Sequence, residues 1–344
     1  MITRLKQLCS LEGVSGREDA VRKYILQELA SSPAEMTISV DALGNVIARV
    51  EGRKRTDCTL LFAAHMDEVG FIITGVTEEG YLRFSAVGGI DSSVIYGKRV
   101  KVNGHTGVLG GKAVHQCKEE EKTKAVSLDK LLIDVAADSR EKALAIARPG
   151  DVAVFDSDFV NLEGDLFKAR ALDDRAGCAL LLELVSEVPE YDITLAFTVQ
   201  EEVGPRGAKT AAYGVKPDIA IVVDSTTAAD TAGVPSDKQV CRVGEGSVVS
   251  FMDNRTLYDK NLYDRIFQTA ERIGIPIQAK SMVAGGNDAG SIQLTRTGVK
   301  VAAVSLPCRY IHSPSCVLSH KDLEATLILL QGLIGEFASG EEED

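Results

Sequence analysis

Residues 59–64 of the chain read Thr59-Leu60-Leu61-Phe62-Ala63-Ala64, and His65-Met66-Asp67-Glu68 follows at once. A short, wholly apolar run of this kind is typical of a strand that is covered on both faces, as in the centre of a parallel sheet. The polar residues after it would lie at the carboxyl end of the strand, which is where open α/β sheets bind their ligands. This stretch therefore predicts an α/β fold with a parallel sheet, and a ligand site at the carboxyl edge of that sheet.

The rest of the chain supplies partners for this strand. A helix is expected from Ile2, a second over 17–30 after the capping-box sequence Ser15-Gly16-Arg17-Glu18, and then a hairpin of strands 36–40 and 46–50. Beyond residue 171, predicted helices alternate with predicted strands; the helices are 174–188, 208–213, 260–273, 289–296 and 320–338, and the strands are 193–199, 219–223, 277–280 and 299–306. This alternation predicts an α/β fold with a mixed, largely parallel sheet sandwiched by helices.

Residues 69–165 have a different character, with short β-like pieces and many glycines, which is typical of a small β-rich domain. The strand at 59–64 needs the later sheet to cover its faces, so we predict an insertion rather than two tandem domains. Residues 1–68 plus 166–344 would form one discontinuous α/β domain, interrupted by the β-rich domain. The charged stretch Lys118–Lys124 is expected to be an exposed loop, and the acidic end Glu341–Asp344 to be frayed.

Composition narrows the possible partners. The 344 residues include 38 Lys and Arg against 50 Asp and Glu, a formal charge of −12, which disfavours nucleic acid and anionic membrane surfaces. No apolar run approaches the ~20 residues that cross a bilayer, and no secretory signal is recognisable at the N-terminus. The seven cysteines are scattered without CxxC spacing, which indicates free thiols in a cytoplasmic protein.

Four predicted strands lead to residues of the kind that bind metal ions in proteins. In chain order these are His65 with Asp67, Glu201 with Glu202, Asp224, and His312. Imidazole and carboxylate ligands together suit zinc, cobalt or manganese. The chain lacks the nucleophile elbow of serine hydrolases and the glycine fingerprint of dinucleotide-binding folds. Four such strand ends in one sheet favour a metal centre.

Each candidate also has a simpler interpretation. His65 and Asp67 stand two residues apart on extended chain, so Asp67 can orient a metal-binding His65; the alternative is a buried histidine bonded to a backbone carbonyl. The neighbouring side chains of Glu201 and Glu202 diverge, so one can bind an ion while the other moves a proton; the alternative is a solvated acidic pair. Asp174 suits a helix cap, which leaves Asp173 free to reach the site.

The charge balance favours two ions. Two divalent ions are neutralised by the carboxylates of Asp173, Glu202 and Asp224 together with one hydroxide. In a two-metal hydrolytic site, a bridging hydroxide is the nucleophile and the metals polarise the scissile carbonyl.

Six ordered motifs extend over nearly the whole chain. They are His65-Met66-Asp67-Glu68-Val69-Gly70, Ala171-Leu172-Asp173-Asp174-Arg175-Ala176-Gly177, Glu201-Glu202-Val203-Gly204, Asp224-Ser225-Thr226, Gly285-Gly286-Asn287-Asp288-Ala289 and Arg309-Tyr310-Ile311-His312-Ser313-Pro314. Together they resemble metallopeptidase family 42, whose members are called tetrahedral (TET), deblocking or glutamyl aminopeptidases and are also labelled cellulase M or endoglucanase. The resemblance implies a zinc-exopeptidase-like fold. It also implies that the insertion is a small β-barrel, PDZ-like domain for dimerisation, with dimers building a hollow tetrahedral dodecamer.

The resemblance further implies roles for the candidate residues. Two divalent ions would bind per subunit, zinc or alternatively cobalt or manganese. The metal ligands would be Asp173 bridging both ions, His65 and Asp224 completing one, and Glu202 and His312 completing the other. Asp67 would orient His65, Glu201 would be the general base, and the peptide bond between Asp173 and Asp174 would be cis.

The predicted function is an aminopeptidase with peptides as substrates. The hydroxide held between the metals would attack the first peptide carbonyl, and Glu201 would take its proton and pass it to the leaving amine. Three alternatives stay open: a related di-metal amidohydrolase acting on acylated amino acids, a glycosidase of the kind that the cellulase label suggests, and a non-enzymatic shell or binding protein.

Overall fold

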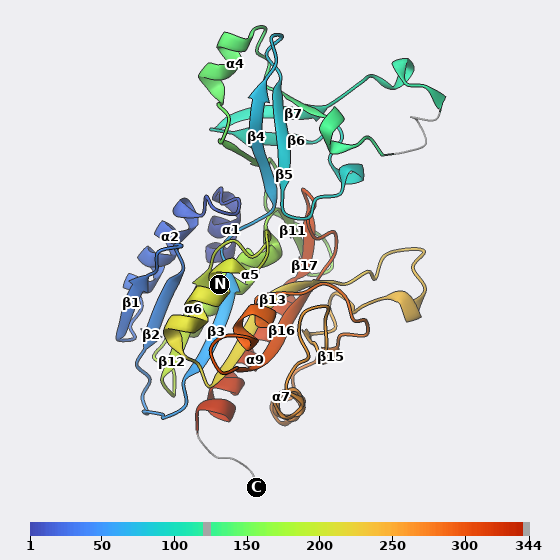
Figure 1. Cartoon of the computed structure of the whole chain (residues 1–344). Helices are drawn as coiled ribbons and strands as arrows, with labels where there is room; N and C mark the ends of the chain where they lie inside the picture. The colour runs from blue at the N-terminus through green and yellow to red at the C-terminus, as the bar shows by residue number, and fades with distance from the viewer. Residues whose placement is uncertain (120–124, 340–344) are drawn as a thin grey trace.

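The computed structural model describes residues 1–119 and 125–339. The charged stretch Lys118–Lys124 therefore lies largely outside the described residues, and the acidic end Glu341–Asp344 lies wholly outside them. A layered α/β body carries a barrel that projects from one end of it (Figure 1).

The centre of the body is one mixed sheet, as predicted. Across the described parts of the chain it contains eight strands, in the spatial order β1 (Met36–Val40), β2 (Val46–Val50), β12 (Ile193–Thr198), β3 (Leu60–His65), β13 (Ile219–Thr227), β16 (Lys300–Cys308), β14 (Ser247–Val249) and β15 (Ile277–Ala279). The central strands β12, β3, β13 and β16 run parallel, whereas β2 and β14 join them antiparallel.

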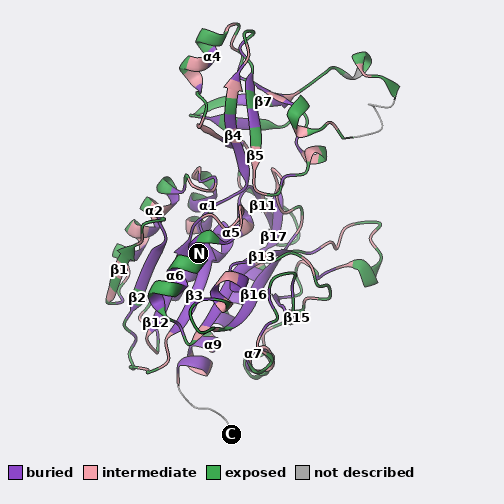
Figure 2. Ribbon diagram, viewed as in Figure 1, coloured by how far each residue is buried: buried purple, intermediate pink, exposed green. Residues whose placement is uncertain are grey.

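Both faces of β3 are covered, which explains its apolar sequence. Leu60 and Phe62 belong to one apolar cluster, while Leu61 and Ala63 belong to another on the opposite face. All six residues of β3 are buried, and the central strands of the sheet are largely buried in Figure 2. A parallel strand can be this apolar only when helices pack on both faces.

Helices form the two outer layers. The helices that pack into the first apolar cluster are α1 (Ile2–Ser10), α2 (Asp19–Ala30), α5 (Leu172–Leu184), α7 (Lys260–Ile273) and α9 (His320–Ala338). The opposite face is covered by α6 (Arg206–Val215) and α8 (Ala289–Gln293). No helix in the described residues is both long and apolar enough to cross a membrane.

The segment between β3 and α5 forms a closed barrel with its own core. Its strands are β4 (Gly70–Val76), β5 (Leu82–Val87), β6 (Arg99–Val102), β7 (His105–Gly110), β8 (Leu132–Asp134) and β9 (Val152–Phe155), and α4 (Arg140–Ile146) packs beside them. The ring of Phe71 makes edge contacts with Phe84 and Phe155 inside the barrel. The prediction of a small β-barrel is thus confirmed.

Short elements join these parts. The chain returns to the body through β10 (Val160–Asn161) and β11 (Leu166–Ala169), which pair with each other, and β11 also pairs with β17 (Cys316–Ser319). Single 3₁₀ turns occupy Ser92–Val94, Val114–Gln116, Leu128–Lys130 and Ser236–Lys238.

Several local predictions need correction, including the helix expected over 289–296, which ends at Gln293. The sequence Ser15-Gly16-Arg17-Glu18 does not form a capping box, because α2 begins at Asp19 and receives no side-chain cap. The strand expected to end at Val223 continues to Thr227, since β13 pairs with β16 as far as Cys308. The helix expected to reach residue 188 ends at Leu184. All seven cysteines lie in the described ranges, and they form no disulfide.

Candidate active site

The predicted site residues come together at the carboxyl edge of the parallel strands. His65 is the last residue of β3, and Glu201 and Glu202 follow β12. Asp224 lies within β13, whereas His312 lies on the loop between β16 and β17. Asp173 comes from the turn before the regular part of α5.

The first cluster is built around His65. Its Nε2 atom lies 3.2 Å from Oδ1 of Asp173 and 3.7 Å from Oδ1 of Asp224. The side chain of His65 is 3% exposed, so these polar atoms meet away from bulk solvent. One imidazole nitrogen thus faces two carboxylate oxygens from separate elements.

The second cluster shares Asp173 with the first. Nε2 of His312 lies 3.4 Å from Oδ2 of Asp173 and 3.2 Å from Oε2 of Glu202. Within each cluster the possible ligand atoms lie within 4.8 Å of one another, close enough to hold one metal ion. Among the described residues, these two clusters are the groups of three or more His, Cys, Asp or Glu side chains that meet this condition. Asp173 therefore offers one carboxylate oxygen to each cluster.

The other ring nitrogen of each histidine is held by the protein. Nδ1 of His65 lies 3.1 Å from the main-chain oxygen of Asp67 and 3.4 Å from its carboxylate, so the predicted carboxylate and the alternative carbonyl both contact the ring. Nδ1 of His312 lies 2.8 Å from the carbonyl oxygen of Gly89. These contacts leave both Nε2 atoms directed at the carboxylates, which is how protein metal sites fix the orientation of their imidazole ligands.

The turn at Asp173 and Asp174 has the expected cis peptide bond. The carboxylate of Asp174 accepts a hydrogen bond of 2.9 Å from the main-chain N–H of Gly177, which agrees with its predicted capping role. Asp174 also accepts a hydrogen bond from the main-chain N–H of His65. This side chain thus fixes the turn, while that of Asp173 enters the site.

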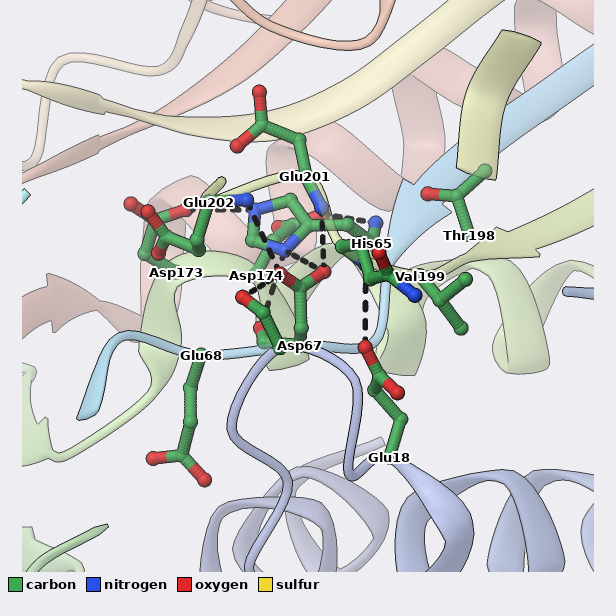
Figure 3. Close-up of polar contacts among 12 residues, drawn as sticks. Glu18, His65, Asp67, Glu68, Asp173, Asp174, Thr198, Val199, Glu201 and Glu202 are labelled. Carbon is green, nitrogen blue, oxygen red and sulfur yellow. Dashed lines mark hydrogen bonds and ion pairs between the residues drawn. The ribbon is translucent and has the colours of Figure 1, made fainter. Parts of the chain in front are cut away.

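Glu201 and Glu202 diverge as predicted (Figure 3). Glu202 joins the cluster of His312, whereas Glu201 lines the adjoining cavity and belongs to neither cluster. The carboxylate of Asp67 accepts the main-chain N–H of Glu201 at 2.9 Å and that of Glu202 at 3.1 Å. Asp67 therefore contacts both the ring of His65 and the turn that carries the two glutamates.

The electrostatics of the site couple the histidines to the carboxylates. Burial opposes charging of His312, but hydrogen bonds to Asp173 and Glu202 raise its pKa to about 11. The pKa of His65 is also raised, since its carboxylate partners outweigh burial. The pKa of Asp173 is lowered because its hydrogen bonds to both histidines outweigh burial. In the metal-free protein, both shifts favour the imidazolium form of the two rings.

Glu201 behaves differently from the residues of the clusters. Burial, together with the neighbouring charges of Asp288, Asp224 and Glu202, raises its pKa to about 10. Cations near such a carboxylate would lower its pKa again, because positive charge favours the ionised form. A strongly shifted carboxyl group that lines a cavity is a candidate for proton transfer.

The donor set fits divalent metal ions. Each cluster combines one imidazole nitrogen with oxygens of two carboxylates, and one carboxylate is common to both. Oε1 of Glu202 is buried and has no hydrogen-bond partner in the part of the chain that is described. Burying an unpartnered carboxylate oxygen is costly, and coordination to a cation would satisfy it.

A cavity of about 190 Å³ extends from the two clusters. Its further wall includes Thr226, Lys280 and Asn287, so a bound molecule would contact polar side chains beyond the metal ligands. A larger cavity of about 1060 Å³ lies where β13 and β16 begin, at the opposite edge of the sheet, and none of the site residues lines it.

Several residues around the site were not predicted. Gly89 binds His312 through its carbonyl, and a Cβ atom at this position would lie 3.3 Å from Nδ1 of that ring. Asp288 is buried beside the site, and its Oδ2 accepts the hydroxyl of Thr198; burial raises its pKa to about 6. Asp288 stands in one of the motifs quoted above, whereas Gly89 contributes only a main-chain atom that no sequence pattern indicates.

The fold and the paired clusters can be compared with those of known proteins. The family of M42 glutamyl aminopeptidases matches residues 44–329, and a putative aminopeptidase of Acetivibrio thermocellus is 41% identical over 96% of this chain and 97% of its own. The chain therefore belongs to the M42 aminopeptidase family and is a peptidase, and membership implies that it uses divalent metal ions.

Solved structures agree with this assignment. An aminopeptidase of the archaeon Desulfurococcus kamchatkensis superposes with a TM-score of 0.92 at 34% identity, covering 97% of this chain and 94% of its own. The TET1 peptidase of Pyrococcus horikoshii superposes with a TM-score of 0.84 at 37% identity, covering 96% and 98%. That peptidase can assemble into a tetrahedron or a large octahedral shell.

Proposed function

We propose that the protein is a di-metal aminopeptidase that hydrolyses the N-terminal peptide bond of peptides. Two divalent ions, zinc or alternatively cobalt or manganese, would be held by the two clusters. His65 and Asp224 would bind one ion, Glu202 and His312 the other, and Asp173 both. When bound, the ions would polarise the scissile carbonyl and lower the pKa of the attacking water.

The chain's own residues would move the protons. Glu201 would accept the proton of the attacking water and donate it to the leaving amine as the peptide bond breaks. Asp67 would keep the ring of His65 oriented through the contacts at Nδ1. The observation that carries this proposal is Asp173, whose two oxygens face two histidines. Glu201 lines the adjoining cavity as the available base.

We also propose that residues 69–165 are an inserted dimerisation domain within a catalytic domain made of 1–68 and 166–344. The separate apolar cores of the barrel and the body support this division. Dimers would assemble further into a tetrahedral dodecamer, as the similarity to a TET peptidase suggests. The seven unpaired thiols support a cytoplasmic location.

A panel of aminoacyl p-nitroanilides tests the activity. Chelator-stripped protein is assayed alone and with zinc, cobalt or manganese, and we expect turnover only after an ion is restored. N-acetylated amino acids and a soluble glucan serve as comparison substrates. Faster cleavage of the acetylated substrates would replace the proposal by an amidohydrolase, and glucan hydrolysis that survives the chelator would replace it by a glycosidase. No turnover with any ion would leave a non-enzymatic metal protein.

A further inference from the structure

The turn after β12, which carries Glu201 and Glu202, is held through its main chain by two buried carboxylates. Oε1 of Glu18 accepts the N–H of Gln200 at 3.2 Å, and the carboxylate of Asp67 accepts the next two N–H groups (Figure 3). Gln200 has a positive φ of 59°, a conformation that a residue with a Cβ atom rarely adopts without such support. Three consecutive N–H groups are thus fixed by side chains from elsewhere in the chain.

Both carboxylates are linked to one N-terminal segment. The hydroxyl of Ser15 donates a 2.6 Å hydrogen bond to Oδ2 of Asp67, and the N–H of Gly16 donates a 2.6 Å hydrogen bond to Oε1 of Glu18. The sequence pattern that resembles a capping box therefore has another use. Its carboxylate binds the turn after β12 directly, its hydroxyl binds Asp67, and neither caps α2.

The energetics of this arrangement favour a role in positioning. Glu18 is 3% exposed and Asp67 is fully buried, and among the described residues neither forms an ion pair with Lys or Arg. Burial and the negative charge of Asp67 raise the pKa of Glu18. Two neighbouring buried carboxylates destabilise a fold. The two carboxylates instead fix the geometry of the turn that carries Glu201, the proposed base, and Glu202, a proposed metal ligand.

We propose that Ser15 and Glu18 are positioning residues of the active site. Glu18 acts through the N–H of Gln200, and Ser15 acts through Asp67, so that Glu201 is aimed at its substrate. This inference rests on the proposed function, because the direction of these side chains matters only if Glu201 moves a proton.

The variants Glu18→Ala, Glu18→Gln and Ser15→Ala test the proposal in the metal-loaded protein. For Glu18→Ala we expect kcat to fall about tenfold or more with KM within about twofold of wild type, because a misplaced base slows the chemical step. Both hydrogen bonds of Glu18 use Oε1, an oxygen that glutamine retains. Glu18→Gln should therefore recover most of the lost kcat. The kcat of Ser15→Ala should lie between those of Glu18→Ala and Glu18→Gln.

Hydrogen exchange measures the turn directly. The amide of Gln200 should lose protection in Glu18→Ala and keep it in Glu18→Gln. Ser139→Ala and Asp259→Ala are matched controls, since each removes a helix cap outside the site: Ser139 accepts the N–H of Lys142, and Asp259 accepts that of Leu262. These controls should lower thermal stability but leave kcat unchanged.

Two results would overturn the proposal. The first is an active wild type whose kcat is unchanged in both Glu18→Ala and Ser15→Ala. The second is a Glu18→Gln variant as slow as Glu18→Ala, with the Gln200 amide still protected in both. If Glu18→Ala does not fold, Ser15→Ala decides: an unchanged kcat overturns the proposal, and a reduced kcat supports it. A wild type that cleaves no substrate would instead refute the proposed function, and this inference with it.

Discussion

The Nε2 atom of His65 lies 3.2 Å from Oδ1 of Asp173, although 108 residues separate the two in the chain. Strands β4 to β9 of the barrel occupy most of that separation, and β11 returns the chain to the body just before Asp173. The insertion thus begins and ends beside the candidate site. Among the hydrogen bonds of the described residues, one joins the insertion to a candidate metal ligand: the carbonyl oxygen of Gly89 contacts Nδ1 of His312.

Glu201→Gln should abolish turnover while leaving metal binding intact. Glutamine matches the shape of the side chain but cannot accept the proton of the attacking water. We expect kcat to fall by about 10²- to 10⁴-fold, with two ions per subunit still measured by elemental analysis. Glu190→Gln is the control, because Glu190 is exposed and forms its ion pair with Lys54. Near-native rates in Glu201→Gln would refute the role of this residue.

Removing one ligand at a time should separate the two ions. His65→Ala and His312→Ala each break one cluster, so each variant should retain about one ion per subunit. Asp173→Ala removes the carboxylate common to both clusters and should retain the least metal. Equilibrium dialysis followed by elemental analysis measures these ratios. Equal loss in the three variants would indicate that the clusters do not bind ions separately.

Metal binding to the stripped protein should release protons at neutral pH. Hydrogen bonds to carboxylates raise the pKa of His312 from 6.5 to about 11 and also raise the pKa of His65, which favours the protonated form of both rings. Metal ions bind the neutral ring, and affinity should therefore increase as the pH rises. Calorimetry in two buffers with different ionisation enthalpies counts the protons. His312→Ala should release about one fewer, and zero release by wild type would contradict the assignment.

Arg175→Met should destabilise the fold. Arg175 is fully buried, and its guanidinium donates to the carbonyl of Leu8 at 2.7 Å and to Oε1 of Glu68 at 3.2 Å. Breaking a buried pair leaves an unpaired charge, which costs about 3–5 kcal/mol. Denaturant titration measures the free energy of unfolding. Arg242→Met is the control, since its partner Glu245 is half exposed and such pairs contribute ~1 kcal/mol or less.

If both variants lose the same stability, the buried pair has no special role. Because Arg170 also binds Glu68, a loss much smaller than expected for Arg175→Met would mean that Arg170 alone neutralises the buried carboxylate.

The sequence was sufficient to predict the parallel centre of the sheet and the residues at its carboxyl edge. Runs such as Leu60–Ala64 are apolar because both faces are covered, and strand order then brings His65 and Glu202 together. The extension of β13 beyond Asp224 was not predictable, because it depends on pairing with residues of β16 about 80 positions later.

Contacts between distant segments of the chain were the main limit on prediction from the sequence. Ser15 has the spacing of a helix cap, and only the position of Asp67 shows that its hydroxyl donates to a carboxylate instead of accepting a main-chain N–H of the helix. Likewise, the carbonyl of Gly89 that orients His312 belongs to no motif, because every residue carries the same main-chain oxygen. Local patterns identify which residues have the chemistry, whereas tertiary contacts decide which atoms they meet.

The positions of Ser15 and His312 have a consequence for synthesis. Translation produces the chain from its N-terminus, and folding of the early segments begins before the late ones exist. All residues of the first cluster, and the candidate base Glu201, have been made once β13 is complete, whereas the second cluster also requires His312, which follows Asp224 by 88 residues. Under the proposed function, a chain folding in this order would gain its last candidate metal ligand well after the others have been made.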